Sequence, residues 1–338
     1  MFLITGGAGF IGSHLAEELW KSGSQIRILD NLSTGKKENL EEAMGNSRFK
    51  FPNSKEGSRI APLGDKGEFI WGDIADLETC RQACQGISFV FHLAALGSVP
   101  RSVEDPITSH RANATGTLNI LHAAKEAKVR RLVYASSSSV YGNLSSDPGG
   151  VKPKREDFPP SPQSPYAATK LAGEQYCRIF ASLYGLETVS LRFFNVFGPR
   201  QDPNSLYAAV IPRFITALLT GQSPHIFGDG NQSRDFTYVE NVVEANLLAA
   251  EAPDVSGGVF NIACGRQTTV NTLLATLQEI SGRKIPPQYE EARSGEVRHS
   301  LSSIELARAH LGYKVKVDLE EGLQATWRWF QKKGKTPE

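Results

Sequence analysis

The stretch Ser-Pro-Tyr-Ala-Ala-Thr-Lys at residues 164–170 places a phenol and an ammonium group four residues apart. Ser164 followed by Pro165 predicts the start of a helix, because serine caps free backbone amides and proline suits the first helical position. Tyr166 then lies in the first turn, with Lys170 on the same face. The lysine charge and the positive end of the helix dipole both favour the phenolate. We therefore expect a lowered pKa for Tyr166, which would make it a base near neutral pH.

Tyrosine and lysine at this spacing also occur by chance on helix surfaces, so the interpretation depends on other stretches. Four consecutive serines, residues 136–139, follow a strand predicted over 131–135. In parallel α/β sheets, ligands lie beyond the carboxyl ends of the strands, so these hydroxyls could meet a substrate. A serine hydroxyl near Tyr166 would reach the same reacting oxygen as the phenol. We therefore treat the two stretches as parts of one predicted site. In a plain loop the same serines would need no explanation.

A glycine-rich turn lies near the start of the chain, between a predicted strand and a predicted helix. Residues 1–5 are apolar, residues 6–12 are Gly-Gly-Ala-Gly-Phe-Ile-Gly, a helical pattern begins at Ser13, and a second strand ends at Asp30. In such a βαβ unit the glycines let the backbone approach a pyrophosphate, whose charge the helix N-terminus meets. Asp30 would accept hydrogen bonds from the adenosine ribose and repel a 2′-phosphate, which favours NAD over NADP. The alternative is a glycine turn with no ligand.

Two later strands end in residues that suit a bound cofactor. The strand over 69–71 leads to Asp73, which could face the adenine. The strand over 89–93 is followed by the small residues 94 and 95, which leave room for close packing. We interpret His92 as a structural residue of that strand rather than as a catalyst. The residues predicted to bind NAD are Gly6, Gly9, Phe10, Ile11, Gly12, Asp30, Asn31, Asp73, Ile74, Leu93, Ala94, Ala95, Tyr166 and Lys170.

The bulk composition restricts the possible partners. The 338 residues carry 37 Lys and Arg against 36 Asp and Glu, a net charge of +1 that offers no general field for nucleic acid or an anionic membrane. Cys80, Cys84, Cys177 and Cys264 lack metal-site spacing and are interpreted as reduced, mostly buried thiols. No apolar run approaches the roughly 20 residues of a membrane helix, and no signal-peptide pattern is present. We expect a cytoplasmic protein without a metal site.

Several of these stretches together resemble one known family. The motifs TGGAGFIG, ILDN, HLAA, SSSSVYG and YAATK are similar to those of the extended short-chain dehydrogenase/reductases, specifically the nucleotide-sugar epimerases. The resemblance covers the chain except residues 46–66, which form either an exposed insertion or a partly disordered segment. It implies that Tyr166 is the active-site base, that Lys170 holds it and the nicotinamide ribose, and that Ser137 assists.

The resemblance continues through the second half of the chain, where it implies a site for a UDP-sugar. Asn195 matches an asparagine that binds the diphosphate, and Arg234 and Arg293 match phosphate-binding arginines. A guanidinium can contact a phosphate through two hydrogen bonds, although Arg234 could instead pair with Asp235 or another acid. Glu296 stands where the family has Asp. The residues predicted to bind substrate are Ser98, Arg101, Ser137, Ser138, Ser139, Asn195, Val210, Arg234, Arg293 and Ser300.

The fold that we expect is α/β, with a Rossmann-type doubly wound parallel sheet and a smaller C-terminal α/β substrate domain. Residues 1–195, together with about 235–265, would bind NAD, and a strand over 259–263 would rejoin the main sheet. Residues from about 196–234 and 266–338 would form a discontinuous domain for the nucleotide sugar. The resemblance also implies a homodimer through the helices near 107–127 and 166–184.

The reaction implied by the resemblance is NAD-dependent 4-epimerisation of a UDP-hexose through a transient 4-keto sugar. Related 4,6-dehydratases carry an Asp-Glu pair where this chain has Ser138 and Ser139, which argues against dehydration. Related decarboxylases need a carboxylate site and a substrate loop that differs from residues 97–102. This loop resembles that of epimerases for N-acetylhexosamine nucleotides and their uronic acids, where Arg101 could pair with a C6 carboxylate. A non-catalytic NAD sensor would keep the glycine turn but could lose Tyr166 and Lys170, so the presence of both with Ser137 argues against that function.

Ser300 gives an argument about the size of the sugar. In these epimerases the residue five positions after the glycine of the Arg-x-Gly-Asp element lies near the C2 substituent. A tyrosine there restricts the site to glucose and galactose, whereas the serine of this chain would admit an N-acetyl group. We therefore expect UDP-N-acetylglucosamine and UDP-N-acetylgalactosamine as substrates, with UDP-glucose and UDP-galactose as a second pair. A 4-epimerase of UDP-glucose or of a UDP-uronic acid is the alternative, and Ser300 could simply be a strand residue.

Overall fold

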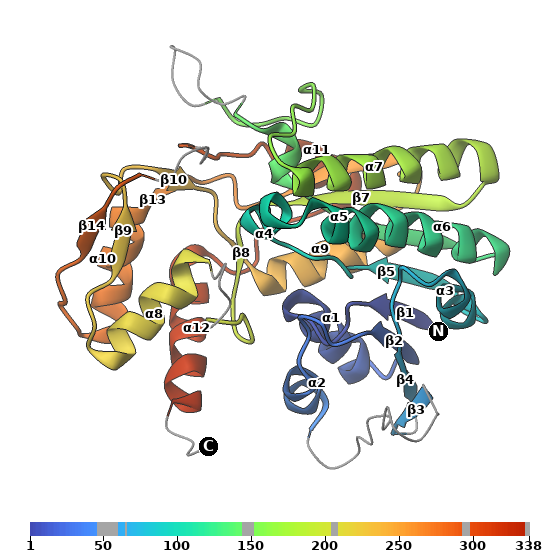
Figure 1. Cartoon of the computed structure of the whole chain (residues 1–338), viewed down its shortest axis with the longest axis horizontal. Coiled ribbons are helices and arrows are strands. Elements are labelled where there is room, and N and C mark those ends of the chain that lie inside the picture. Colours follow the sequence, from blue (N-terminus) through green and yellow to red (C-terminus); the bar gives the residue numbers. More distant parts are fainter. Residues whose placement is uncertain (46–59, 65, 144–151, 204–208, 293–297, 335–338) are drawn as a thin grey trace.

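The computed structural model describes residues 1–45, 60–64, 66–143, 152–203, 209–292 and 298–334. An eight-stranded sheet runs through its centre, in the order β12-β7-β6-β5-β1-β2-β4-β3 (Figure 1). All neighbouring strands are parallel except β3 and β4. The strands are β1 (Phe2–Thr5), β2 (Ile26–Asp30), β3 (Ile60–Leu63), β4 (Gly67–Trp71), β5 (Phe89–His92), β6 (Arg131–Ser137), β7 (Glu187–Phe193) and β12 (Gly258–Ile262). The predicted doubly wound parallel sheet is confirmed, and β12 lies beside β7 as expected.

Helices cover both faces of this sheet. Successive strand residues point to opposite faces, so Ile4 and Ile28 belong to one buried core while Leu3 and Leu29 belong to the other. The first core also contains residues of α1 (Phe10–Lys21), α2 (Lys37–Met44), α9 (Val239–Glu251) and α11 (Glu305–Leu311). The second contains residues of α3 (Leu77–Cys84), α6 (Gly116–Glu126) and α7 (Pro165–Tyr184). The sheet is therefore buried on both sides, and ligands can reach it only at its edges and strand ends.

Helix α7 begins as the sequence predicts. The Ser164 side chain accepts a hydrogen bond from the Ala167 amide at 3.1 Å, and Pro165 is the first helical residue. The helix lies close against β6 because Gly173 has no side chain. A Cβ atom at Gly173 would lie 2.3 Å from the phenol oxygen of the buried Tyr134. This close approach fixes the position of the N-terminal turn of α7 relative to the end of β6.

A second region with its own core adjoins the carboxyl ends of β6 and β7. Its helices α8 (Val210–Thr220), α10 (Val270–Ser281) and α12 (Leu319–Lys333) lie together on the left of Figure 1 and share one buried cluster. Three two-stranded sheets accompany them. These pair β9 (His225–Phe227) with β14 (Gln288–Glu290), β10 (Ser233–Arg234) with β13 (Thr268–Thr269), and β8 (Val196–Phe197) with β11 (Thr237–Tyr238). The chain enters and leaves this region more than once, because β12 belongs to the main sheet.

Three segments differ from the sequence predictions. Part of the stretch over 46–66 is ordered as β3, which pairs antiparallel with β4 at the sheet edge, while residues 46–59 and 65 lie outside the described part. The loop at 97–102 contains a short helix, α4 (Val99–Glu104). The helix expected over 107–127 is divided into α5 (Pro106–His110), a π-helical turn over residues 111–115, and α6. Here Asn113 hydrogen-bonds to the backbone of Leu96, which ties the turn to the loop after β5.

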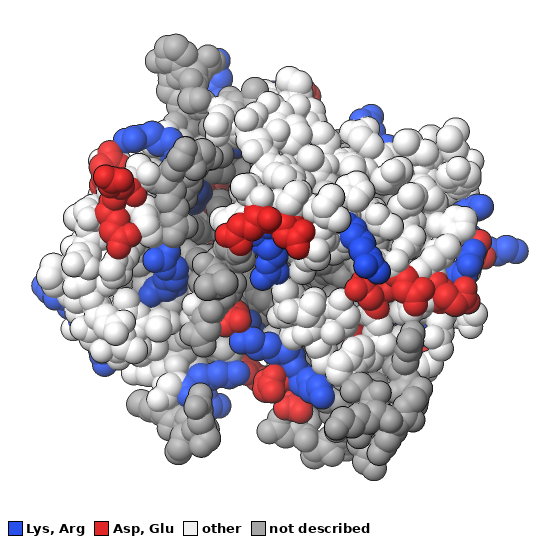
Figure 2. All heavy atoms as spheres, in the orientation of Figure 1, with Lys and Arg blue, Asp and Glu red and all other residues white. Residues whose placement is uncertain are grey.

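The surface and the cysteines agree with the composition. Figure 2 shows basic and acidic side chains interspersed over the visible face rather than gathered into a field of one sign. All four cysteines are free thiols, and Cys80, Cys84 and Cys177 are buried. Within the described residues, no helix combines the length and the apolar character needed to cross a membrane.

Candidate active site

A cavity of about 970 Å³ lies beyond the carboxyl ends of β6 and β7, where these strands meet the second region. The sheet side contributes the serines at 136–139 together with Tyr166, Phe193 and Asn195. The second region contributes Val210, Arg213, His225, Arg234 and Ser300, among others. The cavity therefore brings together residues more than 130 positions apart, at the strand ends where ligands bind in parallel α/β sheets.

Tyr166 and its partners lie at one wall of this cavity. The phenol of Tyr166 hydrogen-bonds with Ser137, the last residue of β6. The Lys170 ammonium lies 5.9 Å from the centre of the Tyr166 ring and donates a 2.7 Å hydrogen bond to the Ala135 carbonyl. The Tyr166 backbone amide donates to the Ser102 hydroxyl at 3.0 Å, so α4 holds the start of α7. The predicted group of Tyr166, Lys170 and Ser137 is thus assembled by the fold.

The expected lowering of the Tyr166 pKa is wrong for the chain by itself. Desolvation by burial raises the pKa of the Tyr166 phenol, and the hydrogen bond with Ser137 only opposes this rise. Burial also lowers the pKa of Lys170 to about 8. Both shifts have one cause, because a low-dielectric site disfavours the charged form of either group. The chain therefore positions Tyr166 beside Ser137 and Lys170 but does not by itself favour its phenolate form.

His92 is a structural residue, as predicted. Its ring is fully buried and hydrogen-bonds to the hydroxyls of Thr5 at 2.7 Å and Thr117 at 3.0 Å. Burial lowers the pKa of His92 to about 3, so the ring is neutral at physiological pH. It links β1, β5 and α6 below the site.

The glycine turn between β1 and α1 has the shape that a dinucleotide needs. A Cβ atom at Gly12 would lie 2.1 Å from the Gly6 carbonyl oxygen, so only glycine allows the turn and the helix to pack this closely. Gly6 has a φ of 72° and a Cβ there would lie 2.7 Å from the Ala94 amide after β5. Gly9 precedes α1, and no side chain caps that helix end. Its amides and dipole are therefore available to a pyrophosphate.

Asp30 lies beside this turn at the end of β2. Its buried carboxylate accepts hydrogen bonds from the amides of Ala8 at 2.9 Å and Leu32 at 2.8 Å, and burial raises its pKa. The neighbouring Asn31 donates to the Asp73 carboxylate at 3.2 Å, so three predicted cofactor residues meet at one edge. The glycine cradle and these acidic groups fit the pyrophosphate and the ribose of NAD.

The remaining predicted cofactor residues differ in what they contact. Ile74 packs against α6, where a Cβ atom at Gly116 would lie 2.6 Å from its side chain. Leu93, Ala94 and Ala95 follow β5, next to Gly6. Phe10 and Ile11 line the cavity described above, which joins the cofactor turn to the substrate side.

Asn195 and Arg234 face the cavity from the junction with the second region. Asn195 has a φ of 35°, a strained value for a residue with a side chain. Its side-chain amide donates a hydrogen bond to the Asp235 backbone carbonyl at 3.0 Å. The Arg234 guanidinium donates to the backbone carbonyls of Ser233 and Arg298. Asp235, its suggested alternative partner, accepts hydrogen bonds from the backbone amides of residues 264, 265 and 302. Burial raises the pKa of Asp235 to about 7.

The other predicted substrate residues fall into three groups. Ser98, Ser137, Ser138, Ser139, Val210 and Ser300 line the cavity. Arg101 lies on α4 but is not among the described residues that line it, whereas its neighbours Val99 and Pro100 are. Arg293, with Glu296, lies outside the described residues. The Ser98 hydroxyl caps α4 by accepting from the Arg101 amide at 3.2 Å.

Comparison with known proteins identifies the family. The model of the NAD dependent epimerase/dehydratase family matches residues 2–263. A putative UDP-glucose 4-epimerase of Methanocaldococcus jannaschii is 37% identical over 99% of this chain and 100% of its own length. The structure of a UDP-N-acetylglucosamine 4-epimerase from Methanobrevibacter ruminantium, in complex with UDP-N-acetylmuramic acid, superimposes with a TM-score of 0.87, 39% identity and 98% coverage of both chains. A UDP-glucuronic acid 4-epimerase from Bacillus cereus, in complex with UDP-glucuronic acid and NAD, gives a TM-score of 0.84, 31% identity and 98% and 99% coverage.

The chain belongs to the NAD-dependent epimerase/dehydratase family. It is therefore an enzyme that uses NAD, and its relatives place it among the UDP-sugar 4-epimerases of the family, which are isomerases. This confirms the resemblance seen in the motifs and the choice of cofactor.

A buried ion pair that the sequence analysis missed supports the end of β6. Glu174 receives two hydrogen bonds from Arg192, at 2.9 and 2.7 Å, and a third from the Ser136 hydroxyl. The Arg192 guanidinium also lies 4.5 Å from the centre of the Tyr141 ring. Glu174 follows Lys170 by four residues on one helix face, which is the spacing that could have drawn attention to it. The network connects α7, β6 and β7 directly below the serines of the cavity.

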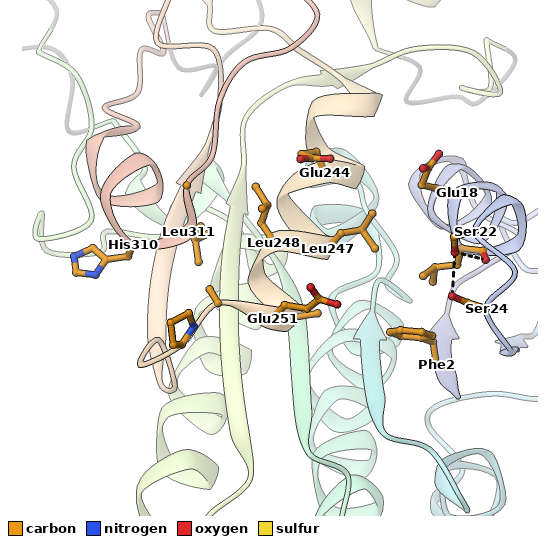
Figure 3. A pocket seen from close by; sticks show the side chains of 15 residues that line it. Phe2, Glu18, Ser22, Ser24, Glu244, Leu247, Leu248, Glu251, His310 and Leu311 are labelled. Atoms are coloured by element: carbon orange, nitrogen blue, oxygen red, sulfur yellow. Dashed lines mark hydrogen bonds between the residues drawn. The ribbon is translucent and has the colours of Figure 1, made fainter.

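A second hollow, of about 660 Å³, lies beside the amino end of β1 (Figure 3). It is bordered by Phe2 at the start of β1, by the hydrogen-bonded hydroxyls of Ser22 and Ser24, and by Leu247 and Leu248 of α9. No predicted site residue lines it. Because Phe2 marks the amino end of its strand, this hollow is not at the edge where parallel α/β sheets bind ligands.

Replacing Arg192 by leucine is expected to destabilise the protein strongly. The substitution leaves the Glu174 carboxylate, only 1% exposed, without its partner, and breaking a buried pair in this way costs about 3–5 kcal/mol. The measurement is the free energy of unfolding from urea titration. The matched control is Arg155→Leu, whose pair with Asp157 is 63% exposed on both sides and should contribute less than about 1 kcal/mol. Equal effects of the two substitutions would contradict this account of the pair.

Proposed function

We propose that this enzyme interconverts UDP-N-acetylglucosamine and UDP-N-acetylgalactosamine by epimerisation at C4, with UDP-glucose and UDP-galactose as a second pair. The observation that carries the proposal is the place of Ser300, which lines the same cavity as Tyr166 and Ser137. Its backbone amide donates to the Ser233 carbonyl at 3.0 Å, so the residue is held beside Arg234. A small side chain there leaves room for an acetamido group next to the site of proton transfer.

The side chains around Tyr166 are suited to exchange a proton with a sugar hydroxyl. Tyr166 would take the proton of the 4-hydroxyl as the carbon is oxidised, and would return that proton to the same oxygen when C4 is reduced on its opposite face after the 4-keto sugar has turned. Ser137, hydrogen-bonded to the phenol, can contact the same oxygen, and Lys170 supplies positive charge beside it. NAD supplies the hydride acceptor and donor, while the protein provides position and the proton path.

Asn195 and Arg234 are proposed to hold the diphosphate. Both line the cavity, and the strained backbone of Asn195 is held by the hydrogen bond to the Asp235 carbonyl. The guanidinium of Arg234 can contact a phosphate through two hydrogen bonds. Arg213, on the first turns of α8, adds a second guanidinium to this wall. The division of the chain into a cofactor domain and a substrate domain stays a prediction, as does the cytoplasmic location.

Replacing Tyr166 by phenylalanine tests the proposed base. We expect turnover of UDP-N-acetylglucosamine to fall at least about 100-fold, the usual contribution of a positioned acid–base group. NAD should remain bound, as measured by its release on denaturation. Tyr184→Phe, at the exposed end of the same helix, is the matched control and should retain activity. Retained turnover in the Tyr166 variant would remove this residue from the role of base.

Replacing Ser300 by tyrosine tests the proposed sugar. The bulkier side chain should lower kcat/KM for UDP-N-acetylglucosamine by roughly 10-fold or more, since loss of room in a binding pocket is worth about 1–3 kcal/mol. Turnover of UDP-glucose should change little and serves as the internal control. The wild-type enzyme is incubated with both sugars without added NAD. Conversion of UDP-glucose alone would refute the proposal, as would release of CO₂ or formation of a 4-keto-6-deoxy product.

We also propose that the chain forms a homodimer through helices α4, α5 and α7. Val103, Ile107 and Leu183 are 64%, 78% and 72% exposed on these helices, which lie against one another. Exposed apolar side chains on helices that pack together favour an interface between copies of one chain. The resemblance to the epimerase family points to the helices near 107–127 and 166–184, which correspond to α5, α6 and α7.

The dimer proposal predicts that charged substitutions on this face lower the mass of the particle in solution. Sedimentation should give twice the mass of one chain for the wild type and a shift towards the monomer for the double variant Ile107→Lys, Leu183→Lys. Leu306→Lys, on an exposed position of α11, is the control and should not change the mass. A monomeric wild type would refute the proposal.

A further inference from the structure

Lys154 is a buried lysine in the wall of the substrate cavity. Its side chain is 2% exposed, and it lies in the proline-rich stretch before α7, where sequence patterns gave it no role. The backbone amide of Lys154 donates to the Leu301 carbonyl at 2.8 Å, which fixes the residue against the segment that carries Ser300. The ammonium group donates to the Gly142 carbonyl at 3.0 Å.

The hydrogen-bond partner of the Lys154 ammonium group is a neutral carbonyl rather than a carboxylate. Removing a charge from water is costly unless an opposite charge compensates it. Among the described residues no carboxylate forms an ion pair with Lys154, and no Asp or Glu lines the cavity in the described part of the chain. Lys154, Arg213 and Arg234 all line it. The described part of the cavity wall therefore carries basic side chains without an acidic one, which suits an anionic ligand.

The hydrogen bond of Lys154 relates it to the place of the sugar, although its ammonium group also senses the charge of Arg234. Gly142, the hydrogen-bond partner of Lys154, directly follows the 3-10 turn over residues 138–141 that begins at Ser137. Ser137 contacts Tyr166, so this turn borders the place of the reacting sugar. The Ser139 hydroxyl, on the same turn, is buried and has no hydrogen-bond partner among the described residues. Lys154 and Ser139 both line the cavity, and both are linked to Gly142, since the Gly142 amide donates to the Ser139 carbonyl at 3.1 Å.

We propose that Lys154 is a specificity-determining residue that binds a carboxylate on the sugar, so that the enzyme also epimerises UDP-N-acetylglucosaminuronate. The Ser139 hydroxyl donates to the same carboxylate. This inference rests on the proposed epimerase function and deepens it. A sugar carboxylate would supply the opposite charge that the described surroundings of Lys154 lack. Lys154 thereby takes the role first considered for Arg101, which does not line the cavity among the described residues.

The ammonium group is charged where the enzyme works. Burial, together with the charge of Arg234, lowers the pKa of Lys154 to about 8, so most of the lysine is protonated at neutral pH. A bound carboxylate would raise this pKa again, because a nearby opposite charge favours the charged form.

The test compares a neutral and an acidic sugar in matched variants. Lys154→Met keeps the length of the side chain and removes its charge, and Arg155→Met is the control at an exposed neighbouring position. We measure kcat/KM for UDP-N-acetylglucosamine and UDP-N-acetylglucosaminuronate, and the inhibition constant of UDP. Lys154→Met should lower kcat/KM for the uronate by about 10–100-fold, the value of a charge-assisted hydrogen bond of about 1.5–3 kcal/mol. The neutral sugar and UDP should change by less than about 3-fold, as should every value in the control.

Other outcomes overturn the inference. An equal loss for both sugars together with weaker inhibition by UDP would assign Lys154 to the diphosphate, and an equal loss without it would assign a structural role. If Lys154→Met does not fold, Lys154→Gln is compared in the same way. A wild type that epimerises the neutral sugar and leaves the uronate unchanged refutes the role of Lys154 alone. A wild type that epimerises no N-acetylated sugar refutes the proposed function as well.

Discussion

The close packing of helix α7 on strand β6 is the contact on which the site depends. Gly173 leaves the space that the Tyr134 ring fills, and Lys170 reaches across to the carbonyl of Ala135. These contacts hold the first turn of α7 at a fixed place, so that Tyr166 meets Ser137 at the end of β6. A larger residue at position 173 would push the helix away from the strand and separate the phenol from the serine.

Burial has opposite consequences for the different charged groups around the cavity. Glu174 and Arg192 compensate each other through two hydrogen bonds and stabilise the end of β6. Tyr166 and Lys170 have no such compensation, and desolvation shifts the pKa of each towards its neutral form. Lys154 shows the same response, in a wall with no described acidic residue. The chain is almost neutral overall, but the described wall of its cavity carries three basic side chains and no acidic one, which suits an anionic nucleotide sugar.

The proposed cofactor and substrate sites adjoin because both are built at the carboxyl ends of parallel strands. The glycine turn follows β1, Asp30 ends β2, and Ser137 ends β6. The second region closes over the same edge with a separate core, and contributes Arg213, Arg234 and Ser300. Phe10 and Ile11 line the cavity from the start of α1, so the cofactor turn and the substrate wall form one continuous surface.

The sequence by itself determined the glycine turn, the start of α7 at Ser164, the parallel sheet and the pair of Tyr166 and Lys170. These features depend on local rules, namely side-chain period, helix caps and residue spacing, together with motifs that one family shares. Only the tertiary structure decided that residues 60–63 form an edge strand, that Lys154 lines the cavity while Arg101 does not, and that Arg192 pairs with Glu174. It also decided the direction of the Tyr166 pKa shift. The reason is that burial and pairing depend on residues distant along the chain, and a desolvated site can outweigh the helix dipole and the lysine that the local pattern places beside the phenol.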